Sequence, residues 1–147
     1  MTFREAERAI KKGDLLLLRH ELEGGLDPNL SNRFSWTLLM VAALQGNSSV
    51  GALLLDHCAD PNRRNEFGDT ALSCAAHTGH PSFVRLLLDC GASLAGSPFG
   101  KTFEDFLDWA EEFGSGSPDA MKRTRSVVRA ARDGEPGSVN DADPLSR

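Results

Sequence analysis

The sequence contains no tyrosine and only three cysteines in 147 residues. Cys58, Cys74 and Cys90 are an odd number, which fits reduced thiols better than a disulfide framework. No apolar run approaches the roughly 18 residues that a membrane-spanning helix needs. The first residues mix charges of both signs without the apolar stretch of a signal peptide. These absences predict an intracellular protein with no membrane partner, and we expect it in the cytoplasm.

Positive charge is also in short supply. Lysine and arginine number 16 against 21 acidic residues, so the formal net charge is −5. Proteins that bind nucleic acid carry a dominant basic face, and we therefore expect no nucleic-acid partner. No Ser-His-Asp or Cys-His arrangement stands out, and nothing brings a pair of carboxylates together. The sequence thus predicts a protein that is not an enzyme and needs no cofactor.

What the sequence does contain is a repeat with a period of 33 residues. Segments 32–64 and 65–97 match at this constant offset. The matched positions are Asn32/Asn65, Phe34/Phe67, Thr37/Thr70, Leu39/Leu72, Ala42-Ala43/Ala75-Ala76, Gly46/Gly79, Leu53-Leu54-Leu55/Leu86-Leu87-Leu88, Asp56/Asp89 and Ala59/Ala92. Carried backward, the offset aligns Asp27-Pro28-Asn29 with Asp60-Pro61-Asn62, so residues 1–31 form a first, degenerate copy. Carried forward with one residue deleted, it opens a partial fourth copy over residues 98–113.

This pattern resembles the ankyrin repeat, in which a turn, an inner helix with paired alanines and a leucine-rich outer helix recur. The resemblance covers roughly residues 3–110. It implies an all-α solenoid of helix-turn-helix repeats with hairpin-like loops over residues 1–113, closed by C-terminal capping helices. The paired alanines would let inner helices approach closely, and the leucines would be buried only where neighbouring repeats stack.

The sequence departs from the family pattern at several positions. Neither full repeat has the proline or the histidine that follows the threonine in the family: Thr37 is followed by Leu38 and Thr70 by Ala71. Gly51 lies inside an outer helix, where it should cost on the order of 1 kcal/mol relative to alanine. Cys58 replaces the glycine that ends an outer helix, so we expect a free thiol whose replacement by glycine stabilises the fold if φ is positive there.

The stretch AGSPFGKT, residues 95–102, ends in the Gly100-Lys101-Thr102 of a phosphate-binding loop. Such a loop needs a glycine where Ala95 stands, and it must join a buried strand to a helix. The repeat instead makes these residues the turn that opens the fourth copy. A nucleotide-binding enzyme that uses this loop is kept as an alternative.

Two helices are expected after this turn. Residues 103–113 predict an amphipathic capping helix with one apolar stripe, formed by Phe103, Phe106, Leu107, Ala110 and Phe113. A Gly-Ser-Gly-Ser linker then leads to a helix from Pro118 to Gly134, within a linker and basic-helix segment 114–134. Its basic residues are Lys122, Arg123, Arg125, Arg129 and Arg132. Residues 135–147 should be a disordered tail.

The basic helix admits two interpretations. Met121, Val127, Val128 and Ala131 would pack on the array and leave the cations in solvent. Alternatively, the helix would dock on an acidic partner, and the protein would be a regulatory subunit. The Lys-Arg-Thr-Arg segment would then also serve as a nuclear import signal, which adds the nucleus to the expected locations.

Two further motifs contain residue types with known chemistry. Cys74, His77 and His80 have the residue types of zinc ligands, but zinc needs four convergent ligands, so we expect no metal site. The resemblance implies that Asn62 occupies the hairpin position at which ankyrin proteins are sometimes hydroxylated by an asparaginyl hydroxylase. The ordinary role of such an asparagine is hydrogen bonding within its turn.

The resemblance also implies where a partner protein would bind. In ankyrin arrays, variable side chains on the hairpin tips and on the exposed edge of the inner helices form one concave stripe. Its members here are Arg33, Phe34, Trp36, Leu44, Gln45, Glu66, Phe67, Asp69, His77, Thr78, Phe99, Lys101 and Trp109. Large aromatic residues at exposed positions are typical of interface hot spots. The alternative is that Phe34, Phe67 and Phe99 pack on one another and serve the fold.

The sequence therefore predicts a monomeric protein that acts as an adaptor, scaffold or inhibitor. A partner segment would lie across Trp36, Phe67 and His77, and the carboxylates of Glu66 and Asp69 would favour a basic residue in that segment.

Overall fold

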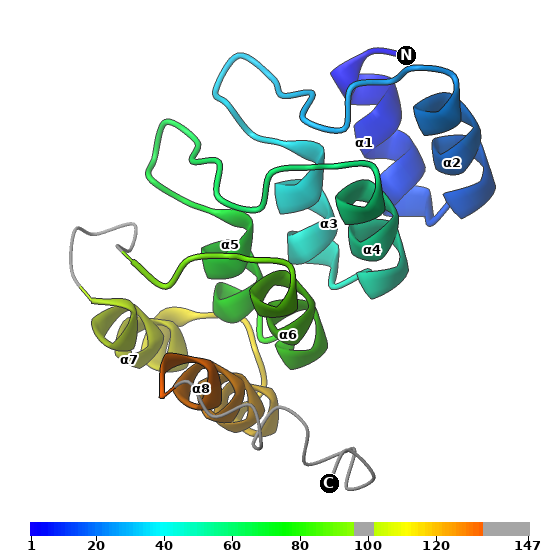
Figure 1. Ribbon diagram of the computed structural model, residues 1–147. Helices are drawn as coiled ribbons and strands as arrows, with labels where there is room; N and C mark the ends of the chain where they lie inside the picture. Colours follow the sequence, from blue (N-terminus) through cyan, green and yellow to red (C-terminus); the bar gives the residue numbers. More distant parts are fainter. Residues whose placement is uncertain (96–101, 134–147) are drawn as a thin grey trace, which may run out of the picture.

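The structure is a computed structural model that describes residues 1–95 and 102–133 (Figure 1). Within these ranges the chain forms eight helices in four antiparallel pairs. They are α1 (Phe3–Lys12), α2 (Leu15–Glu23), α3 (Leu38–Gln45), α4 (Ser48–Asp56), α5 (Ala71–His77), α6 (Pro81–Asp89), α7 (Phe103–Phe113) and α8 (Pro118–Arg132). Helices α1, α3, α5 and α7 stack as an inner layer, and α2, α4, α6 and α8 stack as an outer layer. The expected all-helical array is confirmed.

Threonines at the matched positions begin the inner helices. The hydroxyl oxygens of Thr37, Thr70 and Thr102 accept hydrogen bonds from the backbone N–H three residues on, at 3.2, 3.2 and 3.1 Å. Asp14 and Asn47 cap the outer helices α2 and α4 in the same way, each at 3.1 Å. Each cap satisfies a backbone donor that the first helical turn leaves free. The repeat of the threonine therefore fixes where α3, α5 and α7 start.

The core follows the repeat. The alanine pairs 42–43 and 75–76 are fully buried on the stacked helices α3 and α5, as expected. Leu54 and Leu87 are fully buried at equivalent places in the outer helices α4 and α6, and Leu18 is fully buried in α2. Because each leucine is covered by its own repeat and its neighbours, stability is shared along the array.

Gly51 has a role that the sequence did not predict. A Cβ atom at this position would lie 2.6 Å from the ring of Phe83, which is fully buried in α6. Gly51 therefore lets α4 pack closely against α6. The expected cost of a glycine in a helix remains, but alanine would not recover it, because overpacking of a buried ring is also destabilising.

Cys58 adopts a left-handed backbone conformation with φ of +72°, the conformation that its equivalent Gly91 also adopts, with φ of +93°. A side chain in this region costs about 1–2 kcal/mol. Glycine avoids that cost but loses about 0.5–1 kcal/mol of stability, because its chain loses more entropy on folding. We therefore predict that Cys58→Gly stabilises the protein by about 0.5–1 kcal/mol in urea denaturation.

Cys90 provides the matched control for this substitution. It is likewise an exposed free thiol, but it ends α6 with φ of −98°. Cys90→Gly should destabilise the fold slightly, because glycine relieves no strain there. If both variants lose stability to the same degree, the turn at residue 58 tolerates a side chain without strain.

The last helix pair extends the array. Helix α7 stacks on α5 and α8 stacks on α6, so the basic helix takes the place of a fourth outer helix (Figure 1). Its buried residues are Ala120, Met121, Thr124 and Val128. The expected packing of Met121 and Val128 is thus found, with Val127 partly buried beside them. Phe113 differs from the expected stripe, because its side chain is 61% exposed at the end of α7.

The Gly-Ser-Gly-Ser segment is packed against the array, in contrast to the linker that its composition predicts. The backbone N–H of Ser115 donates to the carbonyl of His77 at 3.1 Å. A Cβ atom on Gly116 would lie 2.7 Å from the Cα of Gly79. The glycines are therefore needed for close approach to the end of α5.

Arg125 joins α8 to the acidic face of α7. Its guanidinium group bonds to Glu104 at 3.0 Å, to Asp108 at 2.9 Å and to Glu111 at 2.6 Å. Partial burial of the guanidinium group lowers the pKa of Arg125. The hydrogen bonds and the negative charges of the carboxylates raise it by more, so its pKa lies above the usual value. Arg132 adds a contact to Glu104 at 2.7 Å. Two of the five basic residues of α8 thus serve the fold.

Candidate functional site

A groove of about 460 Å³ opens between the inner helices and the hairpin-like loops. Six of the residues expected in the binding stripe line it together: Trp36, Leu44, Phe67, Asp69, His77 and Trp109. We call this hollow the aromatic groove. Ser73, Cys74 and Phe106 also line it, although they were not expected to. Phe106 was missed because the stripe of α7 predicts only that its side chain is buried.

Stacked rings form the end of the groove next to α7. The rings of His77 and Trp109 lie 5.2 Å apart at 19°, and those of Phe106 and Trp109 lie 5.9 Å apart at 20°. Phe113 continues the row, with its ring 5.9 Å from that of Trp109. Aromatic pairs in such arrangements are favourable beyond their buried area. The row holds Trp109 in a fixed orientation.

On the opposite side, the hairpin-like loop between α4 and α5 supplies Phe67 and Asp69. The turn is fixed by Asn65, whose Oδ1 accepts the backbone N–H groups of Phe67 and Asp69, each at 2.9 Å. The Phe67 side chain is 63% exposed. This turn therefore presents a large apolar ring and a carboxylate at the edge of the groove.

Cys74 lies at the floor of the groove and is buried. Burial, with a smaller contribution from the Asp69 carboxylate, strongly raises the pKa of its thiol. A neutral buried thiol is a poor nucleophile and a poor metal ligand. His77 stacks on Trp109, and Nε2 of His80 lies 3.3 Å from the carbonyl oxygen of Leu44. His80 precedes α6 but forms no side-chain hydrogen bond that caps it. Within the described residues, no three candidate ligands cluster around a common point.

Other expected members of the stripe lie outside the groove. The Arg33 guanidinium lies 4.6 Å from the centre of the Phe34 ring. The backbone N–H of Glu66 donates to the carbonyl of Phe34 at 3.1 Å, which joins the two loops. Gln45 is exposed at the end of α3, and the Thr78 hydroxyl donates to the carbonyl of Cys74 at 2.8 Å. Phe99 and Lys101, and with them most of the phosphate-loop motif, fall outside the described residues.

Asn62 bridges two repeats. Its Nδ2 donates to the carbonyl of Gly91 at 3.1 Å, and its Oδ1 accepts the backbone N–H of Ser93 at 2.7 Å. Asn29 makes the equivalent pair of bonds one repeat earlier. The side chain therefore connects its turn to the next repeat. The sequence had predicted hydrogen bonds within the turn itself. Hydroxylation of Asn62 stays a prediction.

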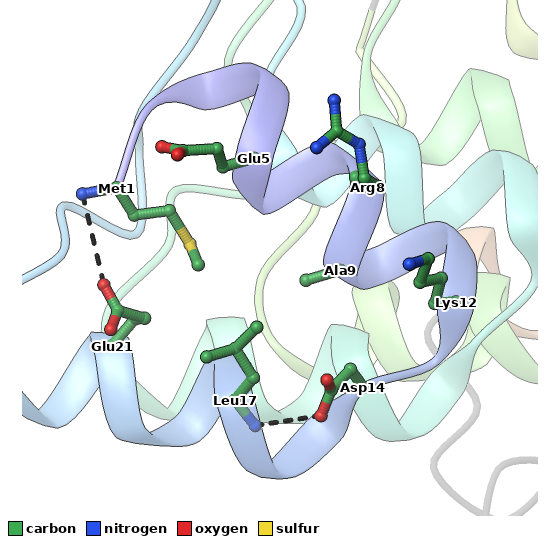
Figure 2. Close-up of a pocket in the computed structure, with 8 residues that line it drawn as sticks. All are labelled: Met1, Glu5, Arg8, Ala9, Lys12, Asp14, Leu17 and Glu21. Atoms are coloured by element: carbon green, nitrogen blue, oxygen red, sulfur yellow. Dashed lines mark hydrogen bonds and ion pairs between the residues drawn. The ribbon is translucent and has the colours of Figure 1, made fainter.

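A second hollow, of about 470 Å³, lies between α1 and α2 at the N-terminal end of the array (Figure 2). Most of its side chains are charged, among them Glu5, Arg8, Lys12 and Glu21. Hydrogen bonds from Thr2 are the main cause that lowers the pKa of Glu5. A polar end face is what a terminal repeat needs to remain in water. We assign this hollow to capping of the array.

The remaining charged surface is on α8. Lys122, Arg123 and Arg129 are exposed, and no ion pair with another described residue holds them. This set is the part of the expected basic helix that is left to contact a partner.

The comparisons with known proteins agree with this architecture. A family model described as ankyrin repeats, in three copies, matches residues 7–95, which is more than half of the chain. No curated protein matches the chain. Among the described helices, none has the length and apolar character to cross a membrane. The matched segment contains the three repeats that the 33-residue period predicts, and the chain belongs to the ankyrin repeat family.

Proposed function

We propose that this protein is a non-catalytic adaptor or inhibitor that binds a segment of a partner protein in the aromatic groove. Ankyrin repeats are protein–protein interaction modules. The observation that supports the groove is that both tryptophans of the chain line it, together with the largely exposed Phe67. Tryptophan is among the residues most enriched in interface hot spots.

The dimensions of the groove suit an extended segment. Its volume falls within the range of about 300–1,000 Å³ that is typical of ligand pockets. Its walls come from three consecutive inner helices, α3, α5 and α7, and from two inter-repeat loops. A segment that crosses them would contact residues from several repeats at once. We also propose that the protein is a monomer and that it acts in the cytoplasm.

We predict that Trp36→Ala combined with Asp69→Lys weakens binding of the partner by at least about 2 kcal/mol, or roughly thirtyfold. Both side chains lie at the rim of the groove and neither is fully buried, so the melting temperature should change little. The partner is captured from native cell extract and purified, and its affinity for each variant is measured by calorimetry.

A charge-reversal variant tests the second candidate, docking through α8. Lys122→Glu, Arg123→Glu and Arg129→Glu leave Arg125 and Arg132 in place, so the contacts between α7 and α8 persist. We expect this variant to keep the partner affinity of the wild type. If it loses binding while the folded groove variant does not, the partner docks on α8 and the groove proposal is wrong.

A further inference from the structure

The geometry points to a subsite for a guanidinium group beside Asp69 in the aromatic groove. This inference rests on the proposed function and specifies the partner segment: an arginine side chain followed or preceded by an apolar residue. The basis is a half-buried carboxylate without a counter-charge on the wall of a mostly apolar groove.

The contacts of Asp69 leave its charge uncompensated. Within the described residues it forms no ion pair, and its one side-chain hydrogen bond is a long one, 3.4 Å from Nδ2 of Asn65 to Oδ2. Arg63, in the same loop as Asp69, is exposed and forms no ion pair with it, and the arginines Arg33 and Arg64 have other contacts. Arg33 lies over the ring of Phe34, and Arg64 donates to the carbonyls of Gly68 and Ala95 at 3.0 and 3.2 Å. Asp69 can therefore accept a cation from a partner.

The field of this carboxylate extends into the groove, because it adds to burial in raising the pKa of the Cys74 thiol. Helix α7, which supplies Trp109 to the groove, carries charge of the same sign. Asp105 and Glu112 are exposed on α7, four residues before and three residues after Trp109, and such spacings lie on one helix face. The Asp105 carboxylate also accepts hydrogen bonds from the backbone N–H and the hydroxyl of Thr102, at 3.2 and 2.8 Å, in the capping box of α7. A cationic side chain is favoured beside Asp69, and an anionic one is repelled.

The aromatic walls favour arginine over lysine. A guanidinium group is planar, stacks on aromatic faces and pairs with a carboxylate through two parallel hydrogen bonds. It is also more weakly hydrated than an ammonium group, so it enters an apolar groove more readily. Trp36, Phe67 and Trp109 supply the rings, and the volume leaves room for an apolar neighbour of the arginine.

The test uses the peptide acetyl-Leu-Arg-Leu-amide and a matched peptide with citrulline in place of arginine. Citrulline has the shape of arginine but no charge. Because Trp36 and Trp109 are the two tryptophans of the chain, intrinsic fluorescence reports directly on the groove. We expect the arginine peptide to bind about tenfold more tightly than the citrulline peptide, and a lysine peptide to fall between them.

Asp69→Asn should bring the affinity ratio of the two peptides to about one, because asparagine keeps the shape of the side chain and removes its charge. Glu66→Gln is the control. It removes a neighbouring exposed carboxylate outside the groove, and the ratio should persist. Equal affinities in the wild type, a ratio that survives in Asp69→Asn, or no binding of either peptide up to about 10 mM would each overturn the subsite.

These outcomes are separable from those of the groove proposal. If Trp36→Ala with Asp69→Lys abolishes partner binding while the two peptides bind alike, the groove stands and the guanidinium subsite is wrong. If the peptides are discriminated through Asp69 but the partner still binds the double variant, the subsite stands and the partner docks elsewhere.

Discussion

Deletion of residues 118–147 is expected to destabilise the protein by about 3–6 kcal/mol, because it removes an outer helix from the stack. Met121 and Val128 are almost completely buried, and burial of each such side chain contributes about 1.5–3 kcal/mol. The deletion also exposes the surface of α6 on which α8 stacks and leaves the carboxylates of α7 without Arg125. Domains of this size are stable by only about 5–15 kcal/mol in total.

The loss is measured by urea denaturation monitored by circular dichroism, and deletion of residues 134–147 alone is the control, because it removes none of the eight described helices. The control should unfold at the same urea concentration as the full chain. If the longer deletion also unfolds like the full chain, α8 contributes no stability and its contact with α6 is not maintained in solution.

The repeat period accounts for how much of the array could be predicted. Equivalent positions meet equivalent surroundings in a stack, so a leucine that repeats at residues 54 and 87 is buried at both. The same alignment matches Cys58 to Gly91, and the structure gives both residues a positive φ. Alignment also selected Trp36 and Trp109 for the groove, because both were assigned to the same stripe.

The parts that could not be predicted depend on contacts between segments without a repeat partner. A Gly-Ser-Gly-Ser composition is typical of flexible linkers, and only the approach of Gly116 to Gly79 shows why glycine is needed. The sequence does not distinguish the basic residues of α8 from one another. In the structure, Arg125 forms ion pairs with three carboxylates of α7. In the sequence, Gly51 is only an unfavourable residue within a helix. In the structure, the ring of Phe83 packs against it and leaves no room for a Cβ atom.

Leu54→Ala and Leu87→Ala are each expected to destabilise the protein by about 2–5 kcal/mol, through lost apolar burial and the cavity that remains. Both side chains are fully buried, in α4 and α6. In so short an array a weakened repeat cannot remain folded against intact neighbours, so the whole domain should unfold in one transition. Tryptophan fluorescence follows the groove and circular dichroism follows all helices, and the two unfolding curves should coincide in each variant.

Leu16→Ala is the matched control for these two substitutions, because Leu16 is a leucine of an outer helix whose side chain is 80% exposed. Its effect should stay within about 0.5 kcal/mol, as for most surface substitutions. A second transition in Leu54→Ala or Leu87→Ala would show that one end of the array folds by itself. The aromatic groove draws its walls from α3, α5 and α7, so coincident curves also mean that the groove is lost together with the fold and not before it.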